Sequence, residues 1–230
     1  MKDMTRWTVI LATVWTAAAN GLWADQSKAK LERIEWSDVR VIDAPETHLP
    51  RVLMIGDSIC LGYFDQVQNH LKGKACCARL ATSKALPSRV FLDEVALLLG
   101  QYRFDVIHFN NGLHGFVAFS EEDYRKSFPA LLKLLKKRAP GAKLIWATTT
   151  PWRKPAPQIQ AFHPNNERVK ARNQIAARFV AKAKIPVDDL YGLMEEHPEC
   201  WADDGLHYTA AGQERQAEQV TTCILNALGE

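Results

Sequence analysis

The sequence predicts a single three-layer α/β/α domain with a central parallel sheet of about five strands. Short apolar runs alternate along the chain with longer stretches that have helical periodicity. The apolar runs are continuous, which is typical of parallel strands that are buried on both faces. A length of 230 residues and a hydrophobic content of 47 % fit one soluble domain of ordinary size.

The expected elements follow one another regularly from residue 51 onward. The strands are expected at 51–55, 74–80, 105–110, 143–148 and 185–187. The helices are expected at about 62–71, 88–99, 121–138, 166–183 and 209–228. Because ligands of such sheets bind beyond the carboxyl ends of the strands, polar residues directly after a strand are the first candidates for a functional site.

The N-terminal region predicts export. Lys2 and Arg6 precede an uncharged run over 7–19, which is too short to span a membrane as a helix, and cleavage is expected after Ala24. Residues 1–24 are therefore expected to be a signal peptide that directs the protein to the periplasm or the medium, with no stable membrane insertion after cleavage. An uncleaved anchor or a core helix is the alternative. A polar lead-in over 25–50 is expected to pack along the outside of the domain at 51–230.

The charge balance argues against a nucleic-acid partner. Lys and Arg number 29 and Asp and Glu number 26, which gives a net charge of +3. Phosphate binding requires a concentrated basic face. The densest basic run lies within 133–138, where it alternates with leucines and is typical of the solvated side of a helix.

The five cysteines do not indicate a metal site. They form no CxxC pair and no Cys/His ligand spacing, so no metal is expected. An odd number leaves at least one thiol outside any intramolecular disulfide. Cys76 and Cys77 are adjacent in an expected strand, where neighbouring side chains point to opposite faces, so they are not expected to bond to each other.

Two segments far apart in the chain carry a candidate catalytic set. Ser58 follows the first expected strand in Gly56-Asp57-Ser58, and a serine hydroxyl becomes a nucleophile when a base removes its proton. Asp204 and His207 lie in a loop before the last helix, where the carboxylate orients the imidazole that faces the serine. Taken separately, each segment is also typical of ordinary turn and cap residues.

Together these segments resemble the SGNH (GDSL-type) hydrolases, a family of esterases and lipases with a flavodoxin-like α/β/α fold. The Gly56-Asp57-Ser58 motif and the Asp204-x-x-His207 motif match in the family's chain order. The resemblance covers about 51–228. It implies that Ser58 is the nucleophile, His207 the general base and then acid, and Asp204 the orienting carboxylate, with no cofactor.

Two positions depart from the family's pattern for the oxyanion hole. The resemblance implies that the backbone N–H of Ser58 is one donor and that an asparagine side chain after the third strand is another. His114 stands at that asparagine position, and a neutral imidazole retains one N–H; Asn111 is the backup donor. After the second strand the family has a glycine, whereas this chain has Ala-Thr-Ser-Lys over 81–84. Thr82 and Ser83 are open alternatives there.

The loop at 151–165 is expected to form the rim of the substrate site. Four prolines exclude a regular helix, and a long loop at the carboxyl edge of a sheet is a natural contact surface. Trp152 and Arg153 are the candidate substrate contacts, together with Phe162 and His163. A role in anchoring the loop is the alternative for the aromatic residues.

These expectations lead to an exported serine esterase that hydrolyses an ester through an acyl-enzyme. Some extracellular branches of the family that are thought to act on acylated carbohydrate are similar in Asn-x-Gly-Leu-His, which favours O-acetyl groups on carbohydrate. The expected partner is therefore a small-molecule or polysaccharide ester. The alternatives are an acyltransferase, a lipase or thioesterase with the same triad, and a non-catalytic carbohydrate-binding protein on this scaffold. The sequence does not predict the oligomeric state.

Overall fold

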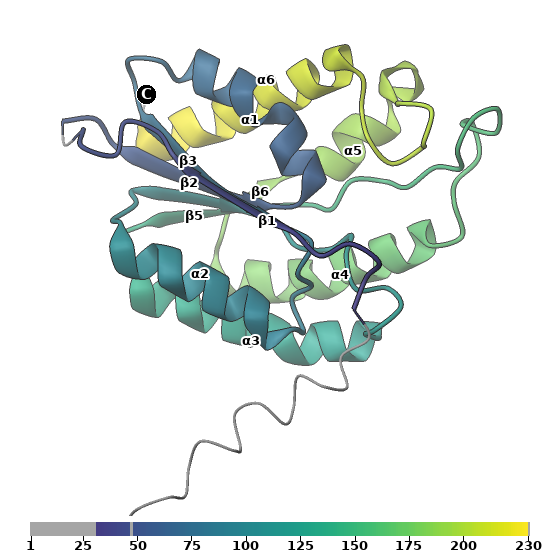
Figure 1. Cartoon of the computed structure of the whole chain (residues 1–230), viewed down its shortest axis with the longest axis horizontal. Helices are drawn as coiled ribbons and strands as arrows, with labels where there is room; N and C mark the ends of the chain where they lie inside the picture. Colours follow the sequence, from purple (N-terminus) through teal and green to yellow (C-terminus); the bar gives the residue numbers. More distant parts are fainter. Residues whose placement is uncertain (1–30, 47, 230) are drawn as a thin grey trace, which may run out of the picture. The chain divides into compact units, whose positions relative to one another are not determined.

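A computed structural model describes residues 31–46 and 48–229 of the chain. These residues belong to one compact unit (Figure 1). The expected signal peptide at 1–24 lies outside the described residues. None of the described helices is long and apolar enough to cross a membrane.

The structure confirms the α/β class, with a sheet of six strands. In chain order the strands are β1 (Ser37–Val41), β2 (Arg51–Gly56), β3 (Cys76–Thr82), β4 (Val106–Phe109), β5 (Lys143–Ala147) and β6 (Val187–Asp188). Their order across the sheet is β1-β3-β2-β4-β5-β6. The strands from β2 to β6 are parallel, and β1 is antiparallel to β3.

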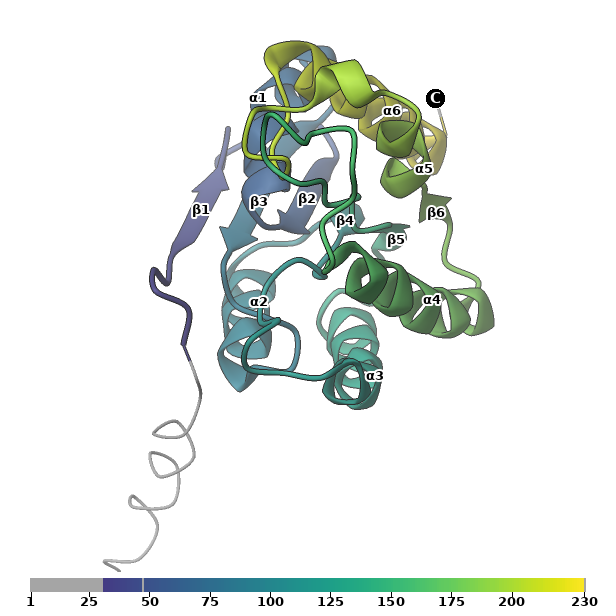
Figure 2. The same cartoon turned by 90° about the vertical axis from the view of Figure 1, so that its right-hand side faces the viewer.

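Helices cover both faces of the sheet. They are α1 (Ser58–His70), α2 (Arg89–Gln101), α3 (Glu121–Arg138), α4 (Asn166–Ala183), α5 (Leu190–Glu195) and α6 (Ala210–Leu228), with a 3-10 turn at Pro198–Cys200. Figure 2 shows α1, α5 and α6 on one side of the sheet and α2, α3 and α4 on the other. Along β2, Val52 and Met54 join one core and Leu53 and Ile55 join the other, because neighbouring side chains of a strand point to opposite faces.

Strand β1 is a feature that the sequence analysis did not expect. It lies within the lead-in and pairs with β3 in a register that sets Val39 opposite Leu80. Asp38 of β1 forms an ion pair with the buried Arg79 of β3 at 2.7 Å. The guanidinium of Arg79 also lies over the ring of Phe64. The folded region therefore begins before residue 51, and part of the lead-in belongs to the sheet.

Candidate active site

Ser58 is the first residue of α1, directly after the turn that ends β2. The carboxylate of Asp57 caps the helix by accepting a hydrogen bond from the N–H of Ile59 at 2.9 Å. Gly56 permits this tight turn, because a Cβ there would lie 2.5 Å from the Cβ of Cys60. The N–H groups of the first helical turn have no intrahelical acceptors, so the backbone around Ser58 favours negative charge.

The loop before α6 places His207 against Ser58. The Nε2 atom of His207 lies 2.8 Å from the Ser58 hydroxyl, and Nδ1 lies 2.6 Å from Oδ2 of Asp204. The Oδ1 atom of Asp204 accepts hydrogen bonds from the N–H groups of Leu206 and His207 at 2.9 and 2.8 Å. The structure therefore brings together the three side chains that the sequence analysis singled out.

The electrostatics of Asp204 favour its ionised form. Burial alone would raise the pKa of Asp204, but the hydrogen bonds from the side chain and backbone of His207 and from the Leu206 N–H outweigh it and hold the pKa below its usual range. An ionised Asp204 requires a proton on Nδ1 of His207. The Nε2 atom of a neutral His207 is then free to take the proton of Ser58.

Gly205 gives this loop its shape. Its φ of +71° lies in the left-handed region, and a Cβ there would lie 2.5 Å from the carbonyl oxygens of Arg153 and Lys154. The N–H of Arg153 also donates to the carbonyl of Gly205 at 2.8 Å. The loop that carries Asp204 and His207 is therefore fastened to the loop that follows β5.

The structure places Asn111 in a role that does not fit an oxyanion donor. Its Oδ1 accepts a hydrogen bond from the N–H of Leu86 at 2.7 Å, and its Nδ2 donates to the carbonyl of Lys84 at 2.8 Å. The residue is 6 % exposed. Because both ends of the amide are engaged inside the protein, Asn111 holds the β3–α2 loop to the β4–α3 loop, and we correct the expectation accordingly.

His114 lies on the loop after β4 and faces the lead-in. Its Nδ1 lies 2.9 Å from Oε2 of Glu32, and the N–H of the next residue, Gly115, donates to Oε1 of Glu32 at 2.9 Å. The Trp36 ring and the imidazole form a T-shaped contact, with ring centroids 6.3 Å apart. Two side chains of the lead-in therefore fix the orientation of His114.

Arg172 of α4 fixes the backbone of the same loop. Its Nη1 donates to the carbonyl oxygens of Gly112 and His114 at 2.9 and 2.7 Å. The buried guanidinium also lies over the ring of Phe116, 4.1 Å from its centroid. The helical periodicity of 166–183 places Arg172 on α4, but no local pattern signals its contact with the loop. Glu32 and Arg172 are thus two site-shaping residues that sequence reasoning missed.

Thr82, the last residue of β3, and Ser83, which follows it, are the open alternatives, and both are directed toward the lead-in. The Ser83 N–H and the Thr82 hydroxyl donate to the carbonyl of Trp36, and the Ser83 hydroxyl donates to Glu35. Lys84 forms an ion pair with Glu35. These contacts anchor residues 35–36 beside the site and leave neither hydroxyl directed at Ser58.

The structure gives the two expected rim residues different surroundings. Trp152 is partly exposed and stacks on His163, with centroids 4.4 Å apart and planes at 12°. Arg153 is 6 % exposed, and its guanidinium donates to the carbonyls of Gln160 and Glu195. Trp152 thus remains a rim candidate. The expectation for Arg153 is corrected, because its charged group is used inside the protein to hold the loop.

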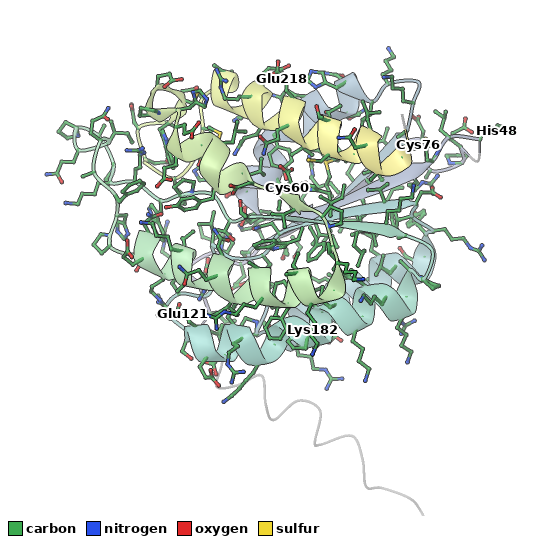
Figure 3. All side chains as sticks on the ribbon, turned by 180° about the vertical axis from the view of Figure 1, so that it is seen from behind. His48, Cys60, Cys76, Glu121, Lys182 and Glu218 are labelled. Carbon is green, nitrogen blue, oxygen red and sulfur yellow. The ribbon has the colours of Figure 1, made fainter. Side chains whose placement is uncertain are left out.

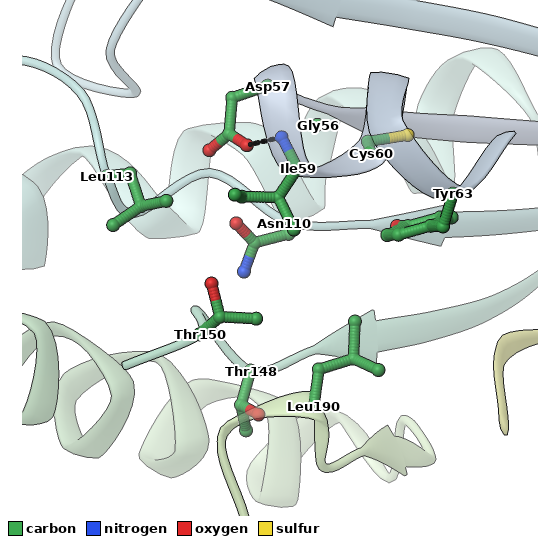
Figure 4. Close-up of a pocket in the computed structure, with 10 residues that line it drawn as sticks. All are labelled: Gly56, Asp57, Ile59, Cys60, Tyr63, Asn110, Leu113, Thr148, Thr150 and Leu190. Carbon is green, nitrogen blue, oxygen red and sulfur yellow. Dashed lines mark hydrogen bonds between the residues drawn. The ribbon is translucent and has the colours of Figure 1, made fainter. Parts of the chain in front are cut away.

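A small cavity, partly open to solvent, lies beside the serine turn. Figure 4 shows its walls, in which Asp57, Asn110 and Thr150 provide polar groups and Ile59 and Leu113 provide apolar ones. Leu113 is the residue before His114 and Asp57 is the residue before Ser58. The cavity therefore joins the loop of His114 to the turn that carries the nucleophile candidate.

None of the five cysteines belongs to the Ser58, His207 and Asp204 set, although Cys60 lines the cavity. All five are described, and none forms a disulfide. Figure 3 shows Cys60 between the helices and the sheet, in contrast to Glu218 on the outer side of α6. Within the described part of the chain, no group of three or more His, Cys, Asp or Glu residues is arranged to hold a metal ion.

A serine, a histidine and an aspartate linked in this order at the carboxyl edge of a parallel sheet are typical of enzymes with a serine nucleophile. Comparison with protein families agrees with that class. The GDSL-like lipase/acylhydrolase family matches residues 54–215. The chain therefore belongs to the GDSL-like lipase/acylhydrolase family. A comparison with curated proteins gives no significant match.

Three solved structures illustrate the fold that this chain shares. A GDSL-like lipase from Bacteroides thetaiotaomicron is 15 % identical, with a TM-score of 0.63 over 81 % of this chain and 93 % of that one. An acetyl xylan esterase is 16 % identical, with a TM-score of 0.60 over 76 % and 99 %. The C-terminal catalytic domain of Streptococcus pneumoniae peptidoglycan O-acetyltransferase A is 20 % identical, with a TM-score of 0.57 over 79 % and 96 %. At these identities the similarity establishes the fold.

Proposed function

We propose that the protein is an exported serine esterase that removes short acyl groups, O-acetyl groups on carbohydrate above all. The observation that carries the proposal is the continuous chain of contacts from Asp204 through His207 to Ser58, with distances of 2.6 and 2.8 Å. Export rests on the sequence pattern of residues 1–24.

The proposed reaction has two halves. The Ser58 oxygen attacks the ester carbonyl as His207 Nε2 takes its proton, and His207 then gives that proton to the leaving alcohol. Water next attacks the acyl-enzyme, with His207 again as the base, which releases the acid and restores Ser58. Asp204 stabilises the imidazolium that forms in each half. The Ser58 N–H and the His114 side chain hold the oxyanion.

Two observations support a substrate carried on a larger molecule. The side chains of His207 and Asp204 are 42 % and 52 % exposed, so the triad lies at an open surface that a polymer-borne acyl group can approach. Trp152, stacked on His163, offers an aromatic face at the rim on which a sugar ring can pack. Among the structures of the same fold, an acetyl xylan esterase and a peptidoglycan O-acetyltransferase bear names that refer to acetyl groups. These names support the proposed preference for O-acetyl groups.

The test is acetate release from acetylated xylan and a short-chain aryl acetate by the wild-type protein and Ser58→Ala. We expect release by the wild type and a loss of several orders of magnitude in the variant. A serine-directed phosphonate should add its mass to Ser58 alone. Ordinary ester hydrolysis by Ser58→Ala contradicts the proposed mechanism. No labelling of the wild type contradicts the enzyme proposal and favours a carbohydrate-binding protein.

Acyl transfer is the second candidate, because one structure of the same fold is the catalytic domain of an O-acetyltransferase. The same acyl-enzyme would then donate its acyl group to a sugar hydroxyl in place of water. Adding oligosaccharide acceptors to the aryl acetate assay distinguishes the two reactions. Acetylated oligosaccharides, detected by mass, in excess of free acetate identify a transferase. Free acetate alone identifies an esterase.

A further inference from the structure

The contact between His114 and Glu32 determines where the imidazole carries its proton. One Glu32 oxygen lies 2.9 Å from Nδ1 of His114, and the other accepts the N–H of Gly115 at 2.9 Å. An ionised carboxylate only accepts hydrogen bonds, so the hydrogen of this contact belongs to Nδ1. The Nε2 atom of a neutral His114 then has no hydrogen to donate.

This tautomer conflicts with oxyanion binding by a neutral ring. Nε2 has no hydrogen-bond partner among the described residues, and the His114 side chain is 18 % exposed, so Nε2 is the nitrogen that remains for a ligand. A bare Nε2 would present a lone pair to a negatively charged oxygen. Nε2 donates only when the ring is doubly protonated.

The charges around His114 favour the doubly protonated ring. Burial would lower the pKa of His114, but the hydrogen bond that the ring donates to Glu32 and the negative charges of Asp57, Glu32 and Glu35 outweigh it and raise the pKa. Burial also acts against the ionised form of Glu32, yet the bonds to His114 and Gly115 lower its pKa. Two cations near the ring act against its positive charge. Lys84 forms an ion pair with Glu35, and Arg172 donates to the carbonyl of His114.

Resting on the proposed esterase function, we propose that His114 is an imidazolium that donates from Nε2 to the oxyanion, and that Glu32 is the positioning residue that keeps the ring charged. The His114 imidazolium then occupies the place of the neutral asparagine amide in the family's pattern. A hydrogen bond from a charged donor to an oxyanion is about twice as strong as a neutral one. The active form of the enzyme therefore holds two histidines in opposite states, His207 neutral and His114 charged.

The test is the pH profile of kcat/KM for a short-chain aryl acetate between pH 5 and 10, with Ser58→Ala as the blank. We expect a bell-shaped profile, in which the alkaline limb reports deprotonation of His114. In Glu32→Gln the alkaline limb should move to lower pH by about one unit or more, because an opposite charge next to the ring is lost. The acid limb should stay in place.

Two further variants complete the design. His114→Asn replaces the titrating donor with an amide, so its alkaline limb should disappear while activity stays above that of His114→Ala. Glu122→Gln removes an exposed carboxylate on α3 and should leave the wild-type profile unchanged. Alkaline limbs that coincide in the wild type, Glu32→Gln and His114→Asn overturn the proposal.

A spectroscopic measurement keeps the inference separate from the proposed function. In the Ser58→Ala protein, the ¹⁵N shifts of His114 should show both nitrogens protonated at neutral pH, and Glu32→Gln should lower the pH at which one proton is lost. A neutral His114 at neutral pH in the Ser58→Ala protein overturns the inference even when the enzyme is an esterase. Absence of Ser58-dependent hydrolysis contradicts the esterase function instead, and with it the catalytic role of a charged His114.

Discussion

The Nε2 atom of His207 lies 2.8 Å from the hydroxyl of Ser58, although 149 positions separate the two residues in the chain. The carboxyl end of β2 places the serine, and the loop before α6 brings the histidine to the same edge of the sheet. The fold thus converts two weak local motifs into one hydrogen-bonded set.

Replacing Asp204 by Asn should reduce kcat without unfolding the protein. The amide removes the charge that stabilises the imidazolium and allows the wrong tautomer of His207, so we expect a loss of about 10²–10⁴-fold with KM little changed. Asp203→Asn, at the exposed position next to it, is the matched control and should retain wild-type kcat. Steady-state kinetics on an aryl acetate measure both. A wild-type kcat in Asp204→Asn would contradict the triad.

Replacing Arg172 by Met should destabilise the protein and weaken catalysis together. The methionine fills much of the space but leaves the carbonyls of Gly112 and His114 without their donor in a buried region, at a cost of about 2–4 kcal/mol in the free energy of unfolding. Urea denaturation measures the loss. Arg172→Lys keeps a donor and should lose less. Equal stability of Arg172→Met and the wild type would show that the guanidinium does not hold this loop.

Gly112→Ala should destabilise the protein by about 1–3 kcal/mol, because the new methyl group would lie 1.9 Å from Oγ1 of Thr149. Gly100→Ala is the matched control. A Cβ at Gly100 of α2 meets nothing within 4 Å, so we expect a gain of about 0.5–1 kcal/mol from higher helix propensity. Denaturant midpoints of the two variants should shift in opposite directions. A midpoint of Gly112→Ala at or above that of the wild type would contradict the close packing of Gly112 against Thr149.

The five cysteines should be unreactive in the folded protein and all titratable after unfolding. Burial raises the pKa of Cys60 and of Cys77 to about 12, so at pH 8 only about one thiol in ten thousand is a thiolate at each. A colorimetric thiol titration should therefore be slow under native conditions. In denaturant without reductant it should count five thiols per chain, and a lower count would reveal a disulfide.

Much of the fold follows from local patterns, because each expected strand and helix buries a continuous or periodic set of apolar residues. The helix at Glu121–Arg138 begins at a capping box, with Ser120 and Asp123 bonded to each other's backbone, and has the expected bounds. Helix α1 begins at Ser58 and not at 62, because Asp57 caps it. Helix α5 has only six residues, too few to show a period.

The parts of the site that the sequence did not reveal depend on long-range pairing. Glu32 and His114 are 82 positions apart, and no spacing rule connects a lead-in glutamate to a loop histidine. Strand β1 is short and polar, and its residues become a strand only because β3 offers a free edge. Asn111 resembles a donor in sequence, and only its burial and its two partners show that it is a clamp.

The place of β1 bears on how this polypeptide can be shortened. A version starting at Arg51 would lack β1 and would expose the backbone hydrogen-bonding groups at that edge of β3. An exposed strand edge promotes self-association. This version would also lack Glu32 and Trp36, the two side chains that orient His114. Truncation before β2 would thus also change the surroundings of His114.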